Sequence, residues 1–397
     1  MSHCVHFGVC GGCAVDDPHA IDKRALLASA LRRAGYENPA IAPLVEIPPY
    51  ARRRADFAAR RGNGGLIPAR QSIDSSGQVA GWDKALISRA AAPPTPRADQ
   101  SAFSRIGLSL GLHKARGAEV VDMRECLLLD PRILALLPAL RDLLRGLQGV
   151  RRAASVVINQ VDNGADLLLR ADAPLSLADR RKLIAFAQAH DLPRISIARE
   201  NAPPEPVVIR SPPVITLSGI PVAPPPGAFL QPSEAGEAAI IGAVLDALPE
   251  KPEKAPIVEL YAGIGTLTFA LARRVRVEAY EGNAPAVAAQ EHALRRHNLD
   301  GRIKLTRRDL ARRPLQPAEL KGRPALVLNP PYGGAAAQMR FLAAAGIPRV
   351  IYISCNPQAL AADAALLRAA GYRLLSATPV DQFPYSENLE AIAVFAR

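Results

Sequence analysis

The sequence predicts an α/β protein of two domains, the second of which is a doubly wound parallel sheet. A chain of 397 residues is longer than one hydrophobic core usually serves, so two domains and a small appendage are expected. From residue 256 onward, β-branched runs alternate with helical patterns, as in parallel sheets covered by helices. A group of prolines between residues 203 and 226 interrupts the pattern. We therefore predict a Cys-rich segment at 1–20, a central α/β domain at 21–226 and a C-terminal domain at 227–397.

The charge of the chain favours a polyanionic partner. The net charge is +12 and the isoelectric point is near 9.8, which attracts nucleic acid without specifying a complex. Several arginines are clustered, and arginine binds phosphate with two donors at once. These clusters are Arg52-Arg53-Arg54, Arg60-Arg61, Arg295-Arg296, Arg307-Arg308 and Arg312-Arg313. The alternative is a solvated basic face. No run of 18 uncharged apolar residues and no signal-peptide pattern occurs, so we expect a cytoplasmic protein without a membrane partner.

The N-terminal segment holds three of the five cysteines. Cys4, Cys10 and Cys13 lie within ten residues, and Gly11-Gly12 allows backbone N–H groups to approach the sulfurs. In a cytosolic chain, clustered cysteines more often bind a metal or a cluster than form disulfides. Three thiolates need a fourth ligand to close a site, and Cys126 is the candidate apart from Cys355. An iron–sulfur cluster is the preferred interpretation, a four-cysteine zinc site uses the same ligands, and unliganded thiols are the third possibility.

The central region reads as mixed α/β structure. An Ala/Leu-rich helix is expected from Ile21 to Ala34, closed by Gly35. Several antiparallel strands and a long loop are expected in 51–125. Further helices and strands follow from the periodicity of apolar residues. The helices are at 131–149 and 177–189, and the strands at 154–159, 166–170 and 194–198.

The C-terminal region begins with a helix from Glu234 to Leu248 and continues with seven strands. The strand candidates are 256–261, 275–281, 302–306, 324–329, 348–354, 372–378 and 389–396. The last two follow the final helix. This order resembles the Rossmann-like sheet of class I S-adenosylmethionine (SAM) methyltransferases.

A Gly-rich turn follows the first of these strands. Tyr261-Ala262-Gly263-Ile264-Gly265-Thr266 leads from strand to helix, and its glycines allow a ligand to approach the backbone. Alone, Gly-x-Gly could serve a dinucleotide or a tight turn. Glu281 ends the next strand, where an acid can accept hydrogen bonds from ribose hydroxyls. The turn and the acid together indicate a nucleotide-type ligand.

Two further strand ends carry candidate binding residues. Asp309 follows the third strand and is expected either to contact an adenine or to cap a helix. Asn329-Pro330-Pro331-Tyr332 ends the fourth strand, and its two prolines stiffen the loop and hold the Asn329 side chain toward the crevice.

The fifth strand ends at Ser354-Cys355-Asn356-Pro357. A cysteine at the carboxyl end of a strand in an open α/β sheet faces the ligand crevice, although free cysteines are often buried structural thiols. Glu390 enters a final strand of otherwise apolar residues. An acid there costs free energy unless it is paired, functional or turned toward solvent. Both residues are candidates for chemistry.

Taken together, these motifs resemble the RNA uracil-C5 methyltransferase family in its iron–sulfur branch. The resemblance covers nearly the whole chain. Its specific parts are Ser-Cys-Asn-Pro and the closing Asp-x-Phe-Pro-x-Ser-x-x-x-Glu, whereas Leu-Tyr-x-Gly-x-Gly occurs in many methyltransferases. The other matching patterns are Cys-x5-Cys-Gly-Gly-Cys with a distant fourth cysteine and Phe229-x-Gln231.

The resemblance implies roles for individual residues. It implies that Cys355 adds to C6 of uracil and makes C5 nucleophilic, and that Glu390 removes the C5 proton after methylation. It implies a [4Fe-4S] cluster held by Cys4, Cys10, Cys13 and Cys126. The SAM-contacting positions map onto Gln231, Tyr261, Gly263, Gly265, Thr266, Glu281, Asp309 and Asn329. The expected partner is RNA, ribosomal rather than transfer RNA, and the expected state is a monomer.

Several positions depart from the family pattern, and alternatives follow from them. Asn329 and Tyr332 replace the usual Asp and Arg, Asn388 replaces a His, and Ser233 replaces an Asn. We expect no counterpart of the family's separate N-terminal RNA-binding barrel before Cys4, so RNA contacts are expected from the basic central domain and the cluster region. Asn-Pro-Pro-Tyr also occurs in amino-methyltransferases, which need no cysteine nucleophile. A non-catalytic RNA-binding or iron–sulfur sensor protein with a degenerate SAM site is the remaining alternative.

Overall fold

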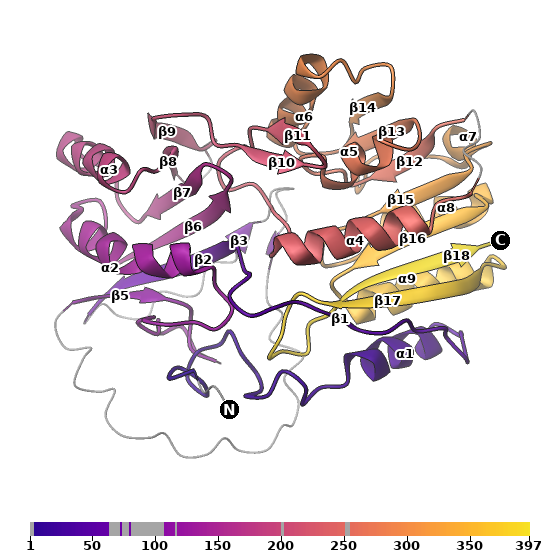
Figure 1. The fold of residues 1–397 in the computed structure, drawn as a ribbon, viewed down its shortest axis with the longest axis horizontal. Coiled ribbons are helices and arrows are strands. Elements are labelled where there is room, and N and C mark those ends of the chain that lie inside the picture. The colour runs from indigo at the N-terminus through magenta and orange to yellow at the C-terminus, as the bar shows by residue number, and fades with distance from the viewer. Residues whose placement is uncertain are drawn as a thin grey trace. The chain divides into compact units, whose positions relative to one another are not determined.

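The chain forms two compact units in the computed structural model (Figure 1). The structure describes residues 4–62, 72–73, 79–80, 107–115, 117–199, 202–250 and 255–397. The first unit comprises residues 1–20, 49–215 and 226–230, and the second comprises 21–48, 216–225 and 231–397. A large part of the segment 51–125, in which antiparallel strands and a long loop are expected, lies outside the described residues. No helix in the described part of the chain is both long and apolar enough to cross a membrane.

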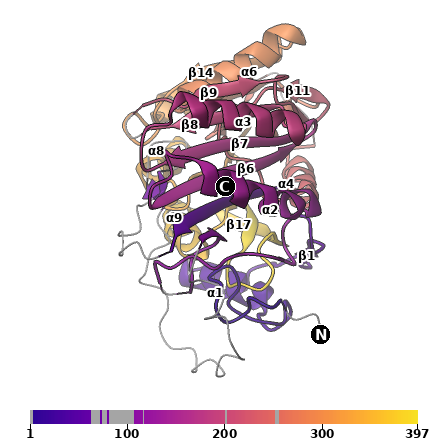
Figure 2. The same cartoon turned by 90° about the vertical axis from the view of Figure 1, so that its left-hand side faces the viewer.

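The first unit is built on a six-stranded sheet in the order β5-β2-β6-β7-β8-β9. The strands are β2 (Arg54–Arg61), β5 (Leu108–Gly111), β6 (Ala153–Val161), β7 (Gly164–Ala171), β8 (Arg194–Ala198) and β9 (Glu205–Ile209). Only β7 and β8 pair in parallel among these neighbours. Figure 2 views this unit, in which helices α2 (Pro131–Gly146) and α3 (Leu177–Ala189) share one core with the sheet. The expected mixed α/β domain is therefore present.

Capping residues set the limits of these two helices. Asp130 caps α2 and accepts the Arg132 N–H, with Pro131 at the first helical position. The prediction extended this helix to residue 149, but the N–H groups of Gln148 and Gly149 donate to the Asp179 carboxylate instead of to helix carbonyls. That carboxylate also belongs to the capping box of α3. One buried acid thus ends α2 and begins α3.

The second unit contains an eight-stranded sheet in the order β1-β17-β18-β16-β15-β12-β13-β14. Its strands are β1 (Val45–Glu46), β12 (Ile257–Leu260), β13 (Val277–Glu281), β14 (Ile303–Arg307), β15 (Ala325–Leu328), β16 (Arg349–Ser354), β17 (Arg373–Asp381) and β18 (Glu390–Ala396). The strands from β12 to β16 run parallel, and β18 is antiparallel to both neighbours. The chain reverses its winding between β12 and β15, and ligands bind at such a switch point in open α/β sheets.

The prediction of seven strands was incomplete, because residues 21–48 add an element to this sheet. Strand β1 pairs in parallel with β17, Val45 opposite Val380. Helix α1 (Lys23–Arg33) buries Leu27 and Leu31 in the same core as helix α9 (Pro357–Ala369). This segment is expected in the central domain, but it belongs to the second unit. An apolar helix face shows that a helix is buried but not which of two cores receives it.

Helices cover the two faces of the second sheet. They are α4 (Glu234–Asp246), α5 (Thr266–Ala272), α6 (Ala284–Arg296), α7 (Pro317–Leu320), α8 (Ala336–Ala345) and α9. Helices α1, α8 and α9 share a core with Val258 and Leu260 of β12. Alternation along a strand turns Glu259 to the opposite face, where Thr268 of α5 lies beside it. Two short hairpins, β3 (Ser72–Ile73) with β4 (Val79–Ala80) and β10 (Ile215–Leu217) with β11 (Ile220–Val222), complete the described elements.

Candidate active site

The Gly-rich turn after β12 has the backbone form that close ligand approach requires. Tyr261, Gly263 and Gly265 all have positive φ angles, of 63°, 58° and 103°. A Cβ on Gly265 would lie 2.4 Å from the Phe269 ring, so the turn needs glycine there. A Cβ on Gly263 would meet no atom within 4 Å. The predicted turn is therefore formed, with open space above Gly263 and with Thr266 as the first residue of α5.

Glu281 joins the end of β13 to this turn. Its two carboxylate oxygens accept the N–H groups of Gly263 at 2.8 Å and of Asn283 at 2.7 Å. Gln290 of α6 is fully buried, and its Nε2 donates to the Gly263 carbonyl at 2.7 Å. The turn is thus held from two sides. Sequence reasoning found Glu281 but missed Gln290, whose only signal was a polar residue on an otherwise apolar helix face.

Asp309 lies after β14 and caps the local turn. Its Oδ1 accepts the N–H groups of Ala311 at 3.0 Å and Arg312 at 3.1 Å, and Arg312 also pairs with its other oxygen. The capping interpretation describes this geometry. The carboxylate is still close enough to Tyr261 to raise the pKa of that phenol, together with burial, which is the larger cause. Asp309 therefore borders the Gly-rich turn as well as capping its own turn.

The loop after β15 is tied to the loop after β16. The Asn329 N–H donates to the Leu260 carbonyl at 3.3 Å, which keeps Asn329 beside the end of β12. Asn356 caps α9 with its side-chain oxygen and donates from Nδ2 to the Tyr332 carbonyl at 3.0 Å. These bonds connect the Asn-Pro-Pro-Tyr loop to the residue that follows Cys355.

A buried acid, which the sequence reasoning missed, supports the same loop from α9. The Asp363 carboxylate accepts the Tyr352 hydroxyl at 2.5 Å and the Ala335 N–H at 2.7 Å. Burial raises its pKa. A Cβ on Gly334 would lie 2.8 Å from the same oxygen, so the close approach of this loop requires glycine.

Cys355 is partly buried at the carboxyl end of β16. Burial, and next the Glu390 carboxylate, raise the pKa of its thiol to about 12. Strand β18 is antiparallel to β16, with Ala391 opposite Ser354. The start of β18 therefore lies at the same sheet edge as Cys355. The two catalytic candidates, 35 residues apart in the sequence, are neighbours in the fold.

Glu390 is 5% exposed, which excludes the solvent-facing interpretation. Burial raises the pKa of its carboxyl to about 8, and a bond from Gln382 opposes the shift. Gln382 Nε2 lies 3.5 Å from the Glu390 carboxylate and donates to Gln231 Oε1 at 3.0 Å. Gln231 is thus close to the acid as well as being a predicted cofactor ligand. The sequence reasoning gave Gln382 no role, although it stands in the closing motif.

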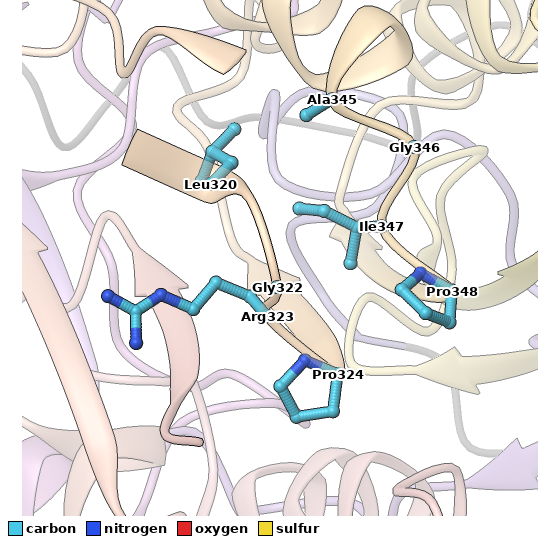
Figure 3. A pocket seen from close by; sticks show the side chains of 8 residues that line it. All are labelled: Leu320, Gly322, Arg323, Pro324, Ala345, Gly346, Ile347 and Pro348. Carbon is cyan, nitrogen blue, oxygen red and sulfur yellow. The ribbon is translucent and has the colours of Figure 1, made fainter. Parts of the chain in front are cut away.

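A pocket of about 210 Å³ lies at the amino ends of β15 and β16 (Figure 3). Its lining includes Pro324 and Pro348, which precede β15 and β16 directly. The predicted site residues instead follow the carboxyl ends of these strands. This pocket is therefore separate from the candidate active site.

The four cysteines predicted to bind a cluster gather in the first unit. Cys13 has a pKa of about 12 because of burial and then of Cys126, Cys10 and Cys4. The Gly12 N–H donates to Cys10 Sγ at 3.4 Å. Within the described ranges, however, no three or more His, Cys, Asp or Glu side chains are arranged as ligands of a metal ion. The expected metal site is therefore not shown, although its thiols are in electrostatic contact.

Part of the arginine cluster in the first unit has an internal role. Arg53 is 5% exposed. The Arg61 guanidinium donates to the carbonyls of Val150, Arg145 and Leu147 at 2.7, 2.6 and 3.2 Å, in and just after the last turn of α2. Arg53 is buried and Arg61 is bonded internally, so the charge pattern overstated the basic surface that this segment offers.

Comparisons with known proteins agree with this geometry. A family model described as tRNA (uracil-5-)-methyltransferase matches residues 224–397. The chain is 32% identical to an RNA methyltransferase of Brucella suis, over 99% of this chain and 84% of the relative. It is 30% identical to the 23S rRNA (uracil(1939)-C(5))-methyltransferase RlmD of Cronobacter sakazakii, over 99% and 81%. The crystal structure of Pyrococcus abyssi tRNA (uracil-54, C5)-methyltransferase with S-adenosyl-L-homocysteine has a TM-score of 0.61, at 16% identity over 94% and 82%.

The fold and the Gly-rich turn define a Rossmann-like α/β domain. The full-length match to curated RNA methyltransferases narrows the class. The chain belongs to the RNA uracil-C5 methyltransferase family and is by family a SAM-dependent enzyme. The resemblance to the RNA uracil-C5 methyltransferase family, drawn from the sequence motifs, is confirmed.

Proposed function

We propose that this protein methylates C5 of a uridine in RNA through a covalent bond between Cys355 and C6, with Glu390 as the base. The observation that carries the proposal is the meeting of a partly buried thiol and a buried carboxyl at one sheet edge. Amino-group methylation would give neither residue a role. A non-catalytic sensor would not need an acid whose burial raises its pKa to about 8.

The chemistry divides one difficult step into easier ones. The Cys355 thiolate bonds to C6, and the C5–C6 π electrons move onto the C4 carbonyl, which makes C5 nucleophilic. SAM, when bound, supplies the methyl group that C5 takes up. Glu390 then accepts the C5 proton, the electrons of that bond restore the C5–C6 double bond, and the C6–S bond breaks to return the thiolate. A carboxylate with a raised pKa is a stronger base for this step than a solvated one.

The residues around the Gly-rich turn fit SAM. Open space above Gly263 leaves room for a ligand against the backbone, and Glu281 is held at the edge of that space. We assign the eight predicted positions to SAM binding, with Glu281 on the ribose hydroxyls. Calorimetry with SAM tests this assignment, because Glu281→Ala should weaken binding while Glu278→Ala, on the same strand, should not. Equal affinities for both variants would contradict it.

The proposed substrate is ribosomal RNA, specifically 23S rRNA. Support comes from the named 23S rRNA methyltransferase that matches nearly the whole chain. The uridine would have to leave its stack to reach Cys355, as bases do in other enzymes that modify them. Mapping 5-methyluridine in RNA from cells with and without the gene tests the substrate. A missing methyl group in transfer RNA, with ribosomal RNA unchanged, would contradict this part.

The covalent step is tested with RNA that contains 5-fluorouridine. Fluorine at C5 cannot leave as a proton does, so the adduct with Cys355 should persist after methyl transfer. We expect a SAM-dependent band on a denaturing gel for the wild type and none for Cys355→Ala. Cys126→Ala, assayed at a temperature where calorimetry shows it to be folded, is the cysteine control and should keep the band. Failure of the wild type to form this band would reject the mechanism.

We further propose that Cys4, Cys10, Cys13 and Cys126 hold a [4Fe-4S] cluster. A cluster extends over several atoms, so its ligands lie farther apart than those of a single ion. Burial, and next the neighbouring thiols, raise the pKa values of Cys4, Cys10 and Cys13, which fits such an arrangement. Burial lowers the pKa of the Arg52 guanidinium, and the nearby Cys126 and Cys13 oppose this shift. The guanidinium can therefore offset thiolate charge. Protein purified without oxygen should be brown with about four irons per chain. A colourless protein with one zinc would contradict the proposal.

A further inference from the structure

Lys23, the first residue of α1, is a buried lysine held by three oxygen atoms. The residue is 1% exposed. Its Nζ pairs with Asp381 Oδ1 and donates to the carbonyls of Phe383 at 2.8 Å and Asn388 at 3.0 Å. The ammonium group has three donors, so each has an acceptor. Burial lowers the pKa of Lys23, and the Asp381 contact opposes this shift.

These three acceptors lie at the two ends of one loop. The loop connects β17, which ends at Asp381, to β18, which begins at Glu390. Phe383 is near its start and Asn388 near its end. One ammonium group therefore joins both ends to α1, more than 350 residues away in the sequence.

The loop also has internal bonds that support the same shape. Asp381 Oδ1 accepts the Phe383 N–H at 3.2 Å. The Ser386 hydroxyl donates to the Phe383 carbonyl at 2.9 Å, and the Asn388 N–H donates to that hydroxyl at 3.3 Å. These bonds are local, whereas Lys23 is a fixed point outside the loop. Without Lys23, the loop keeps its two strands and the bond from Gln382 to Gln231 but loses the group that binds both of its ends.

The two ends of the loop that Lys23 binds are adjacent in the sequence to residues that position the Glu390 carboxylate. Gln382, which lies 3.5 Å from that carboxylate, is between Asp381 and Phe383 in the sequence. Asn388 precedes Glu390 by two residues. Lys23 therefore holds the chain on both sides of the acid without reaching the acid itself. A leucine at this place would avoid the cost of burying a charge but would bind neither carbonyl.

We propose that Lys23 is a positioning residue for proton removal, holding the loop between β17 and β18 so that Glu390 meets the C5 proton of the methylated uracil. The inference rests on the proposed function. Lys23 donates no proton to the reaction. The proton passes from C5 to Glu390, and the C6–S bond breaks as the double bond is restored.

The competing explanation is a stabilising ion pair without influence on catalysis. Both explanations expect Lys23→Met to unfold at a lower temperature, because it leaves Asp381 buried without its partner. They differ in which step slows. Misplacement of Glu390 by about 1 Å should slow proton removal by about 10²-fold while methyl transfer, which precedes it, keeps its rate. Loss of stability alone changes both steps equally through the fraction of folded protein.

The experiment is a single-turnover assay with unmodified RNA and methyl-labelled SAM, quenched in denaturant. It measures the rate of methyl transfer and the rate at which the protein–RNA adduct disappears. We expect Lys23→Met to transfer methyl within about 3-fold of the wild type and to release the adduct about 10²-fold more slowly, as Glu390→Gln does. Asp381→Asn, which keeps the lysine and both carbonyl bonds, should release the adduct at a rate between those of Lys23→Met and the wild type.

Arg24→Met is the matched control. Arg24 is the next residue of α1 and donates to the carbonyls of Ala42 and Ile41 at 3.1 and 3.2 Å, away from the loop. The Arg24→Met variant should keep the wild-type rates of methyl transfer and of adduct release. The inference is overturned if Lys23→Met, at a temperature where calorimetry shows full SAM binding, releases the adduct as fast as Arg24→Met. If Lys23→Met does not fold, Asp381→Asn decides by the same comparison. If the wild type forms no adduct, the proposed function itself fails.

Discussion

The thiols of the two units differ in what raises their pKa. In the second unit, burial and one carboxylate act on Cys355. In the first unit, burial and three other thiols act on Cys13. A group of thiols that disfavour one another's ionisation is suited to a shared cationic centre, whereas a single thiol beside a potential base supplies the two groups that an addition–elimination reaction needs. The same residue type is therefore expected to have two separate uses.

The largest expected effect comes from Cys355→Ala. We expect RNA methylation to fall by at least about 10³-fold, because the bond to C6 cannot form. Methyl incorporation from labelled SAM measures the effect. SAM affinity should remain unchanged, since the thiol is not among the SAM positions. Activity within a few-fold of the wild type would remove the distinction between Cys355 and the other cysteines.

Next in size is the pH dependence of adduct release. Only the ionised Glu390 carboxylate can accept the C5 proton, and its pKa is about 8 in the folded protein. The release rate should rise by about tenfold per pH unit below pH 8 and level off above it. The Glu390→Gln variant should release slowly at every pH. A flat wild-type profile between pH 6 and 8 would show that another group removes the proton.

The same pKa shift has a consequence for stability. Because the folded state binds the Glu390 proton more tightly than the unfolded state does, this residue lowers stability as pH rises from about 4.5 toward 8. At pH 8, the melting temperature of Glu390→Gln should therefore exceed that of the wild type by at least about 3 °C. At pH 5 the difference should shrink. Calorimetric melting at both pH values provides the measurement, and a destabilised variant at pH 8 would contradict the assignment.

A third effect separates the two sets of thiols. Cys126→Ser should lose most of its iron and melt at least about 5 °C lower, since ligand loss removes binding free energy that contributes to folding. The 5-fluorouridine adduct should still form at a temperature where the variant is folded. Loss of the adduct in folded Cys126→Ser would mean that the first unit takes part in the reaction at Cys355.

The smallest effect concerns the reactivity of Cys355. Replacing Glu390 by Gln removes the carboxylate that raises the Cys355 pKa, so alkylation by iodoacetamide at pH 9 should be about 3- to 10-fold faster. Glu387→Gln is the matched control, because Glu387 is an exposed carboxylate in the same loop. Equal rates in the two variants would show that Glu390 does not influence the thiol.

The sequence by itself determined the strands, the Gly-rich turn and the identity of the two catalytic candidates. Alternation of apolar runs and helices is a local pattern, and the turn needs glycine for its backbone angles, so both can be read from neighbouring residues. The resemblance to the family rested on short motifs such as Ser354-Cys355-Asn356-Pro357. Each of the seven strand candidates is present, and β1 is an eighth strand of the same sheet.

Only the tertiary structure decided what lies far apart in the chain. Helix α1 joins the second unit because its apolar face fits that core, and strand β1 joins it by pairing with β17, neither of which periodicity can specify. Gln382 and Asp363 gained roles through contacts with residues on other elements. Lys23 gave no signal in an Ala/Leu-rich helix, because the burial of a lysine depends on oxygen atoms that the fold brings to it from the opposite end of the chain.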